Sequence, residues 1–399
     1  MNKDLIIELL KKYPSFYLYD ESVIEESVNL LKEKFPNAQF LYSMKCNPNE
    51  HILRTLFNMG MGADAASVGE VRTAARMGLA KNEIYYSAPG KSYKDIEEAI
   101  DKSVIIADSI SEIERIDKIS KDRGLVTSIG VRLNPDFGFG GGAPIPAKFG
   151  IDEEQFFDFF AEKKCENIKI TGLHVHLKSQ ELDALKIADY HKNVFVLAKR
   201  FKEVCGCLEY VNLGSGLGIT YNKADVPVDV DYVAGEFTKL KDSLGADTKI
   251  MIETGRYAVG KSGVYATTVL DRKVSRGKTY VILKNTLNGF VRPAMAKMVE
   301  RYSSDEYPAP CEPMYTCKDA FQIIPLADGT ATERVTLVGN LCTAQDVIAE
   351  NVMMPHLEYG DGIVMTNAGS YAAVITPMQF SSQEKPAELF LKADGTVIK

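Results

Sequence analysis

Residues 39–66, QFLYSMKCNPNEHILRTLFNMGMGADAA, decide the fold. The first six residues, 39–44, are mostly apolar and aromatic, as in a buried strand, and 62–66 is a second short strand candidate. Between them, His51–Met59 has the apolar spacing of a helix that packs on a core. A strand, a helix and another strand in this order predict two parallel strands joined by a crossover helix.

The same alternation continues over about 215 residues, the size of a (β/α)8 barrel. Further strands are predicted at 83–87, 104–108, 127–133, 168–175, 209–213 and 249–253. Helical segments are predicted at Val68–Met77, Ser111–Lys121 and Asp152–Ala161, with Ser67, Ser111 and Asp152 as N-caps. The rival fold, an open doubly wound sheet, gathers its ligand-binding residues at one switch point, whereas a barrel gathers them from many strand ends. Polar residues end several of these strands, so we predict an α/β fold with a TIM-type barrel.

The pattern changes after residue 260. Short strands are predicted at 263–270, 279–284, 335–339 and 362–366, with turns between them and little helix. A chain of 399 residues also exceeds the size at which a single core usually stops growing. We therefore predict a barrel over 25–260 and a C-terminal, mostly-β domain over 261–399. The N-terminal residues 1–24 are expected to join the second domain through a strand at Ser15–Tyr19.

Composition excludes several classes of protein. Lys and Arg number 47 and Asp and Glu 54, giving a net charge of −7, and no basic run indicates nucleic-acid binding. The sequence contains no run of about 18 apolar residues, so we predict no membrane-spanning helix. The first residues, MNKDLIIELLKKYP, lack the apolar stretch and cleavage site of a signal peptide. Seven cysteines are an odd, sparse set that suits a reducing compartment, so we expect a cytoplasmic protein.

Residues Gly255–Ser262, GRYAVGKS, fit the phosphate-binding pattern G-x-x-x-x-G-K-[ST]. A P-loop also needs a strand before the motif and a helix after it. The segment that follows is β-branched and reads as a strand, so it offers no helix N-terminus for a phosphate. A P-loop nucleotide enzyme is therefore the less favoured alternative.

Two other motifs lie at predicted strand ends. His174 and His176 fall on the same face of the sixth strand, but a metal site there would need carboxylates as further ligands, and we predict no metal. Gly214-Ser215-Gly216-Leu217-Gly218 follows the seventh strand. Successive glycines let backbone N–H groups approach an anion, and barrels often bind phosphate in the loops after strands 7 and 8. Arg256 lies in the second of these loops.

Lys45 ends the first barrel strand and Glu253 ends the eighth. Taken alone, Lys45 is explained as a solvated lysine and Glu253 as the ion-pair partner of Arg256. Together with the glycine loop and His176, however, they supply an amine, a buried acid, a phosphate cradle and a flat ring. These are the parts that pyridoxal 5'-phosphate requires: a Schiff-base lysine, a phosphate site, a ring-face contact and a partner for the pyridine nitrogen.

The chain resembles the alanine-racemase-fold (fold type III) pyridoxal phosphate decarboxylases, and within them the diaminopimelate decarboxylase branch. The resemblance rests on ordered motifs over nearly the whole length: YSMKCNPN (42–49), HVHLKSQ (174–180), NLGSGLGI (212–219), ETGR (253–256), GNLCTAQD (339–346) and NAGSY (367–371). It implies a Schiff base on Lys45, ring stacking on His176, and a proton donor, Cys342, that reaches in from the partner subunit of a homodimer.

The resemblance also implies the remaining site residues. The cofactor contacts are Lys45, Asp64, His176, Ser179, Gly214, Ser215, Gly216, Glu253, Gly255, Arg256 and Tyr371. The substrate contacts are Arg256, Arg292, Thr343 and Tyr371. Glu253 favours decarboxylation, because racemases of this fold place an arginine at the pyridine nitrogen. A non-catalytic cofactor-binding protein of this fold is disfavoured, because it would need neither Cys342 nor the second domain.

Some positions depart from the family pattern. Lys178, Thr254 and Ser370 stand where the family has Gly, Pro and Ala, and Ser215 interrupts a triple glycine. Arg292 is retained, but Ala296 and Thr343 replace a Tyr and a Glu on the substrate side. The expected function is therefore decarboxylation of an amino acid, similar to that of diaminopimelate decarboxylase. The alternatives are ornithine, lysine, arginine, a carboxylated polyamine or a carrier-tethered amino acid.

Overall fold

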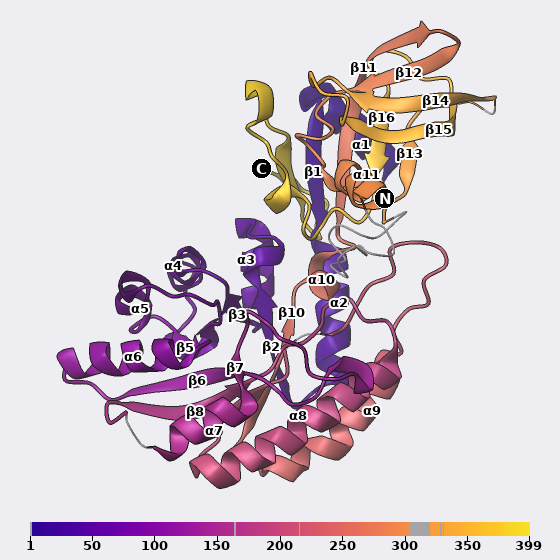
Figure 1. Ribbon diagram of the computed structural model, residues 1–399. Coiled ribbons are helices and arrows are strands. Elements are labelled where there is room, and N and C mark those ends of the chain that lie inside the picture. The colour runs from indigo at the N-terminus through magenta and orange to yellow at the C-terminus, as the bar shows by residue number, and fades with distance from the viewer. Residues whose placement is uncertain (1, 163–164, 215, 303–319, 328, 330) are drawn as a thin grey trace. The chain divides into compact units, whose positions relative to one another are not determined.

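The computed structural model describes residues 2–162, 165–214, 216–302, 320–327, 329 and 331–399 (Figure 1). It contains two compact units. The barrel unit consists of Glu25–Ile219 and Val226–Ala258. The β-rich unit consists of Met1–Ile24, Thr220–Asp225 and Val259–Lys399.

Eight parallel strands close into a barrel. In pairing order they are β5 (Val104–Ala107), β4 (Ile84–Tyr86), β3 (Gly62–Ala65), β2 (Ala38–Ser43), β10 (Lys249–Thr254), β9 (Tyr210–Asn212), β8 (Ile168–His174) and β6 (Thr127–Asn134). Pairing of β6 with β5 closes the ring, and a short β7 (Ile151–Asp152) pairs beside β6. The predicted barrel and each of its eight strands are confirmed.

Helices follow the strands and lie on the outside of the sheet (Figure 1). They are α2 (Glu21–Lys34), α3 (Glu50–Asn58), α4 (Val68–Arg76), α5 (Tyr93–Ala99), α6 (Ile110–Asp122), α7 (Glu153–Ala161), α8 (Ala184–Cys205), α9 (Val230–Lys241) and the short α10 (Arg256–Val259). Ser67 caps α4 as predicted, through a hydrogen bond from the backbone N–H of Glu70. The predicted cap Ser111 is wrong: α6 begins one residue earlier, and Ser109 caps it. Asp152 precedes α7, but its carboxylate accepts from Asn134 and makes no cap bond.

An apolar layer fills the barrel toward the amino ends of its strands. Its buried members are Leu41, Tyr85, Ile106, Tyr210 and Met251. The Tyr210 ring needs unusual space, because a Cβ built at Gly130 would lie 2.3 Å from its hydroxyl and one at Gly172 would lie 2.0 Å from its Cζ. Glycines on β6 and β8 therefore make room for this one phenol ring.

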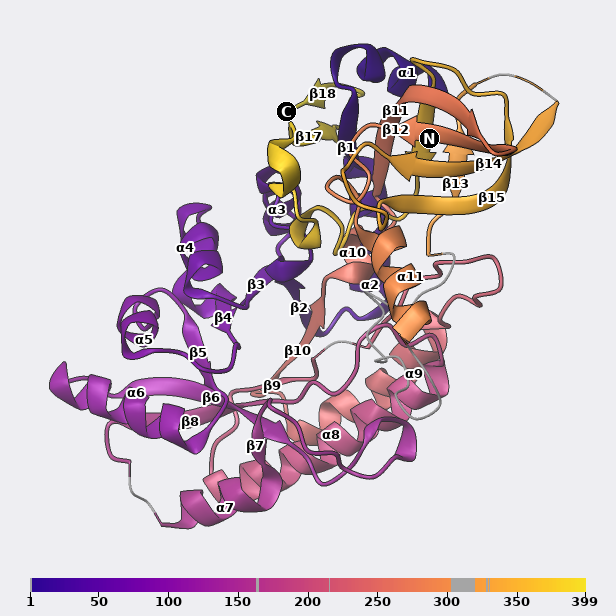
Figure 2. The ribbon, with the colours of Figure 1, turned by 45° about the horizontal axis from the view of Figure 1, so that its top comes forward.

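The β-rich unit is built around β1 (Ser15–Asp20), which pairs antiparallel with β11 (Gly263–Ser275) and parallel with β17 (Ala387–Leu391). This confirms the expected pairing of the N-terminal strand. The remaining strands are β12 (Lys278–Leu283), β13 (Ile323–Pro325), β14 (Thr332–Gly339), β15 (Val347–Pro355), β16 (Gly362–Met365) and β18 (Val397–Ile398). Figure 1 labels β16, and Figure 2 labels the others.

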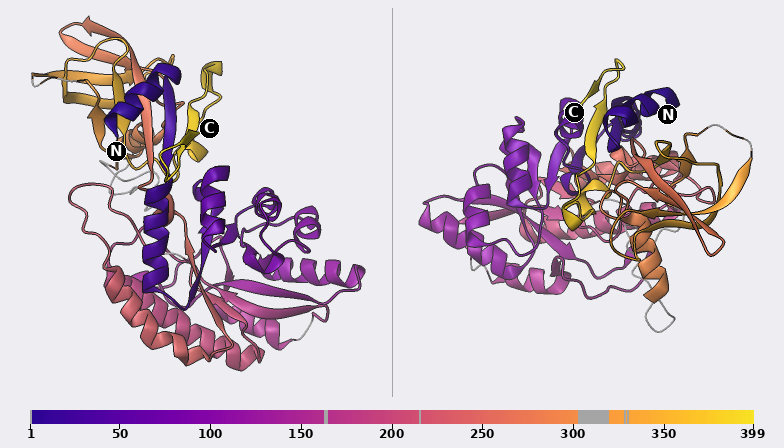
Figure 3. Two further views of the ribbon diagram at one scale, coloured as in Figure 1. Left: turned by 180° about the vertical axis from the view of Figure 1, so that it is seen from behind. Right: turned by 90° about the horizontal axis from the view of Figure 1, so that it is seen from above.

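Two helices belong to the β-rich unit, α1 (Lys3–Lys12) and α11 (Arg292–Tyr302), and α11 was not expected from the sequence (Figure 3). In the part of the chain that the structure describes, no helix is both long and apolar enough to cross a membrane.

Candidate active site

Lys45 lies just after β2, in a short 3₁₀ turn (η1, Met44–Cys46) at the carboxyl end of the barrel. The Tyr42 hydroxyl donates to the carbonyl of Asn47 at 2.9 Å and so fixes the chain on both sides of the turn. The two strands that flank β2 each carry an acid here, Asp64 in β3 and Glu253 in β10. Because the carboxyl ends of parallel strands meet at one end of a barrel, an amine and two acids come together.

The two acids control the charge of the amine. Desolvation lowers the pKa of Lys45, but Asp64 and Glu253 outweigh it and raise that pKa above its usual value. Burial and Glu253 raise the pKa of Asp64, while Lys45 opposes them. Asp64 Oδ1 accepts from the Ser87 hydroxyl at 2.6 Å, and its buried Oδ2 has no hydrogen-bond partner among the described residues. One carboxylate oxygen is thus available to a donor on a ligand.

Glu253 is 3% exposed and is surrounded by polar side chains. Its Oε1 accepts from the Asn212 amide at 2.9 Å and lies 3.1 Å from Nε2 of His174, and its Oε2 lies 3.6 Å from Nδ1 of His176. Burial would raise the pKa of Glu253, but His174, His176 and Lys45 outweigh it and hold that pKa far below its usual value. A buried acid that stays ionised can stabilise a proton on a nearby ring nitrogen.

His176 is a neutral, oriented ring. Desolvation lowers its pKa to about 3 despite the nearby Glu253, and Arg132 adds to the lowering. Arg132 also donates from Nη2 to the His176 carbonyl at 3.1 Å, which fixes the backbone behind the ring. Both His174 and His176 turn toward the same acid, as their shared strand face predicts. Among the described residues, no three His, Cys, Asp or Glu side chains are placed to hold a metal ion.

The glycine loop begins where β9 ends. Gly214 has a φ of +65°, and a Cβ there would lie 2.5 Å from the Val175 carbonyl and 2.7 Å from Nδ1 of His176, so only glycine fits. The Gly214 N–H donates to Oδ1 of Asn212 at 2.9 Å. The amide that holds Glu253 therefore also holds the start of the loop. Ser215 lies outside the described residues.

A second loop, after β8, is fastened to the glycine loop. The Gln180 amide donates to the Ile219 carbonyl at 2.5 Å and accepts from the Ile219 N–H at 3.0 Å. Beside it, the Glu181 N–H donates to the Gly216 carbonyl at 2.8 Å, and the Gly218 N–H donates to the Glu181 carbonyl at 2.9 Å. Ser179 lies half-buried on this second loop, next to Gln180.

The loop after β10 packs tightly on the Lys45 turn. A Cβ at Gly255 would lie 2.1 Å from Sγ of Cys46, and Arg256 is buried at the start of α10. This helix has only four residues, and the chain continues into β11 at Gly263. The GRYAVGKS segment therefore lacks the long helix that a P-loop requires after its motif.

Four predicted residues belong to the β-rich unit. Arg292 is 3% exposed; its Nη1 donates to the Asn367 carbonyl at 3.3 Å, while its Nε and Nη2 have no hydrogen-bond partner in the described chain. Cys342 is exposed, and Thr343 and Tyr371 are half-buried, the latter with a φ of +48°.

Sequence reasoning missed three residues that position the others. Asn212 joins Glu253 to the glycine loop, and Gln180 joins that loop to the loop after β8. Asp346 accepts from the backbone N–H groups of Leu287 and Leu341 and so holds the turn that carries Cys342. Asn212 could have been found, because it is a polar residue at the end of an apolar strand, the same signal that identified Glu253.

Comparison with known proteins agrees with this geometry. Residues 21–260 match the family model described as the pyridoxal binding domain of pyridoxal-dependent decarboxylases. An L-glutamyl-[BtrI acyl-carrier protein] decarboxylase from Niallia circulans is 30% identical, over 98% of this chain and 92% of that protein. A diaminopimelate decarboxylase from Helicobacter pylori strain J99 is 29% identical, over 96% and 92%. The crystal structure of Helicobacter pylori diaminopimelate decarboxylase with L-lysine superposes with a TM-score of 0.82, at 27% identity, over 98% of this chain and 94% of that one.

The chain therefore belongs to the fold type III family of pyridoxal-phosphate-dependent decarboxylases. It is a carboxy-lyase that acts on an amino acid, with pyridoxal 5'-phosphate as its cofactor, and its relatives include diaminopimelate decarboxylases.

The residues at the carboxyl end of the barrel fit this cofactor. An amine is available at Lys45, and an ionised buried acid, Glu253, suits a protonated ring nitrogen. The neutral ring of His176 suits a face contact, and the glycine at 214 leaves a cradle that a Cβ would fill.

Proposed function

We propose that the protein decarboxylates an amino acid whose far end carries an acid or amide group, as in diaminopimelate decarboxylases. The observation that carries the proposal is the buried guanidinium of Arg292, which has two donor nitrogens without partners among the described residues. Leaving such donors buried and unpaired is unfavourable by about 1–3 kcal/mol or more. The planar fork of an arginine suits a carboxylate, which can accept from both nitrogens.

We assign the cofactor contacts to Lys45, Asp64, His176, Ser179, Gly214, Ser215, Gly216, Glu253, Gly255, Arg256 and Tyr371. Pyridoxal phosphate, when bound, supplies the electron sink that accepts the pair released as CO₂ leaves. Glu253 maintains the positive charge of the ring nitrogen, because an adjacent anion favours the protonated form. His176 would contact the ring face, and the glycine loop would hold the phosphate, with the Gly216 N–H among its donors.

Lys45 and Cys342 handle amine and proton transfer. The Lys45 amine would hold the cofactor covalently. Cys342 delivers a proton to the carbon that has lost CO₂, and Arg256, Arg292, Thr343 and Tyr371 orient the substrate. We further propose a cytoplasmic homodimer in which Cys342 acts in the active site of the partner subunit.

A screen of CO₂ release tests the substrate. It compares diaminopimelate, lysine, ornithine, arginine and carboxylated polyamine precursors with and without Arg292→Ala. We expect turnover to be highest for a substrate with a distal acid, and Arg292→Ala to raise its KM sharply while leaving cofactor affinity unchanged. An unchanged KM for the best substrate would contradict the distal-acid assignment.

A carrier-tethered amino acid is the second candidate. It is supported by the 30% identity to the L-glutamyl-[BtrI acyl-carrier protein] decarboxylase and by Ala296 and Thr343, which supply no carboxylate for a distal ammonium. A substrate joined to a carrier through its far end leaves no such ammonium to be paired. Faster CO₂ release from a glutamyl-carrier protein than from every free amino acid would favour this candidate.

Mixing two inactive variants tests the shared site. Lys45→Ala and Cys342→Ala subunits, refolded together, should regain part of the wild-type activity, because a mixed dimer then contains one intact site. Mixed dimers that form but remain inactive would show that each site belongs to one subunit.

A further inference from the structure

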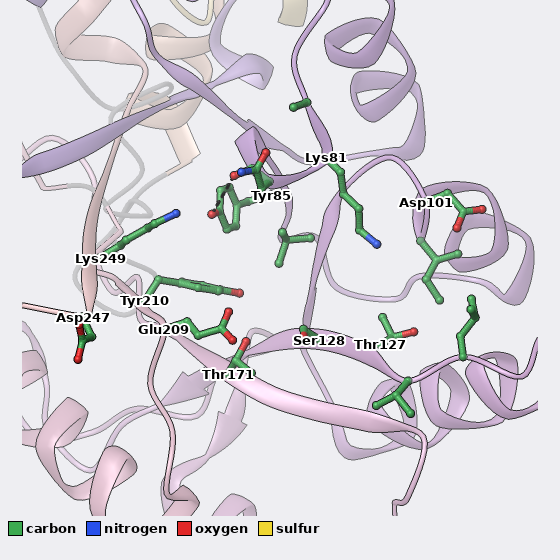
Figure 4. Close-up of a pocket in the computed structure, with 16 residues that line it drawn as sticks. Lys81, Tyr85, Asp101, Thr127, Ser128, Thr171, Glu209, Tyr210, Asp247 and Lys249 are labelled. Carbon is green, nitrogen blue, oxygen red and sulfur yellow. Dashed lines mark hydrogen bonds between the residues drawn. The ribbon is translucent and has the colours of Figure 1, made fainter.

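A large pocket lies at the opposite end of the barrel from Lys45 and Glu253. It is formed within the barrel unit, mainly at the amino ends of β4, β5, β6, β9 and β10, and has a volume of about 900 Å³. Pockets that bind small molecules usually measure about 300–1,000 Å³. We call it the amino-end pocket (Figure 4); its lining includes Lys81, Tyr85, Leu125, Val126, Ser128, Glu209, Tyr210 and Lys249.

The pocket has an aromatic base. The rings of Tyr85 and Tyr210 meet edge to face with centroids 5.3 Å apart. Tyr210 is only 4% exposed, and its buried hydroxyl has no hydrogen-bond partner among the described residues. Glycines at 130 and 172 clear the space that this ring occupies. The hydroxyl therefore lies inside the apolar layer next to Gly130, and the two tyrosine rings form the base of the pocket.

Three charged side chains around the pocket, Lys81, Glu209 and Lys249, are exposed and accessible to a ligand. Lys249 begins β10 and Glu209 directly precedes the neighbouring strand β9. Figure 4 shows Glu209 and Tyr210 extending in the same direction, with Lys249 on one side and Ser128 on the other. In the described part of the chain, neither Lys249, Glu209 nor Lys81 makes an ion pair, whereas a lining acid nearby, Asp101, pairs with Arg123 at 2.8 Å.

Apolar side chains complete the lining. Val126 is 60% exposed and Leu125 is 41% exposed, both in the turn before β6. A lysine and a glutamate that do not pair with each other, beside tyrosine rings and exposed aliphatic groups, match a ligand with both charges and an apolar body. We propose that the amino-end pocket binds an α-amino acid with an apolar side chain. The carboxylate contacts Lys249, and the ammonium contacts Glu209 on the neighbouring segment.

Calorimetric titration of the holoenzyme with L-phenylalanine and L-leucine tests the proposal. We expect binding in the millimolar range or tighter, weakened at least about tenfold by Lys249→Met and by Glu209→Gln, because each removes a charge-assisted contact. Lys199→Met changes an exposed lysine on α8 that does not line the pocket, and it should leave binding unchanged.

Two measurements separate this pocket from the active site. The kcat and KM for the substrate should stay at wild-type values in Lys249→Met and Glu209→Gln, because both residues lie at the far ends of their strands. Phenylpropionate and phenylethylamine, each of which lacks one charge, should bind at least about tenfold more weakly than L-phenylalanine. Three results would each overturn the proposal: no binding of either amino acid, wild-type affinity in Lys249→Met or Glu209→Gln, or a singly charged analogue that binds as tightly as L-phenylalanine.

Discussion

The two ends of the barrel use charge in opposite ways. At the carboxyl end, Glu253 is buried among Asn212, His174 and His176, and its pKa is held low. At the amino end, Glu209 and Lys249 lie on the neighbouring β9 and β10 segments, yet neither has an ion-pair partner in the described residues. Charges that are already oriented by the protein can stabilise a reacting group without rearranging. Glu209 and Lys249 are instead exposed, so water solvates them and a ligand can reach both.

Replacing one glutamate at each end by glutamine should give the largest difference in decarboxylation rate. Glu253→Gln should retain cofactor binding but slow decarboxylation by at least ~10²-fold, the lower range for loss of one preorganised electrostatic contact. The matched variant Glu209→Gln, in the neighbouring segment at the other end, should leave the rate unchanged. Steady-state CO₂ release measures both; a Glu253→Gln enzyme with the wild-type rate would show that this acid is not the partner of the ring nitrogen.

Loosening the two loops at the carboxyl end should have a smaller effect. Gln180→Leu removes two hydrogen bonds to Ile219 and should weaken cofactor binding about tenfold, because each such bond contributes about 0.5–1.5 kcal/mol.

The control variant, Gln180→Gly, separates the effect of the lost side-chain amide from the effect of backbone strain. Gln180 has a φ of +61°, so Gln180→Gly relieves backbone strain but also removes the amide. Both variants should lose cofactor affinity, measured by equilibrium titration of the apoenzyme. Wild-type affinity in either one would indicate that the amide does not position the glycine loop.

The sequence predicted the barrel well because its strands are continuously apolar and polar residues end them. The same pattern placed Lys45 and Glu253 at the carboxyl ends of their strands, where the structure has them. It did not locate Gln180, whose role depends on a contact with Ile219, 39 residues away. Nor did it predict α11, since the strand pattern on both sides of Arg292 obscures a helix whose first residues are Arg-Pro. Contacts between loops depend on tertiary packing, so the local periodicity of the sequence does not predict them.

The smallest expected effect concerns His191, a buried histidine that, unlike His174 and His176, has no acid beside it. His191 in α8 is buried, and desolvation lowers its pKa from 6.5 to about 4. Between these values the unfolded chain binds the proton more readily, so this residue lowers the free energy of unfolding as pH falls below 6.5. At pH 5 the loss is about 2 kcal/mol.

His191→Phe should remove this part of the pH dependence, because a phenyl ring can pack against Phe237, whose ring centroid lies 6.4 Å away. Urea unfolding of both proteins at pH 7 and pH 5 measures the difference. An identical loss of stability in wild type and variant would show that His191 is not the residue responsible.

The central claim is that the carboxyl end of the barrel holds the cofactor on Lys45. Borohydride reduction of the wild-type holoenzyme, followed by proteolysis and mass spectrometry, tests it most directly, because reduction makes the lysine linkage permanent. We predict the phosphopyridoxyl group on Lys45, in the peptide that contains YSMKCNPN, and no lysine label in Lys45→Ala. A label on another lysine of the wild-type protein, such as Lys178 beside the glycine loop or Lys249 at the amino end, would contradict the account.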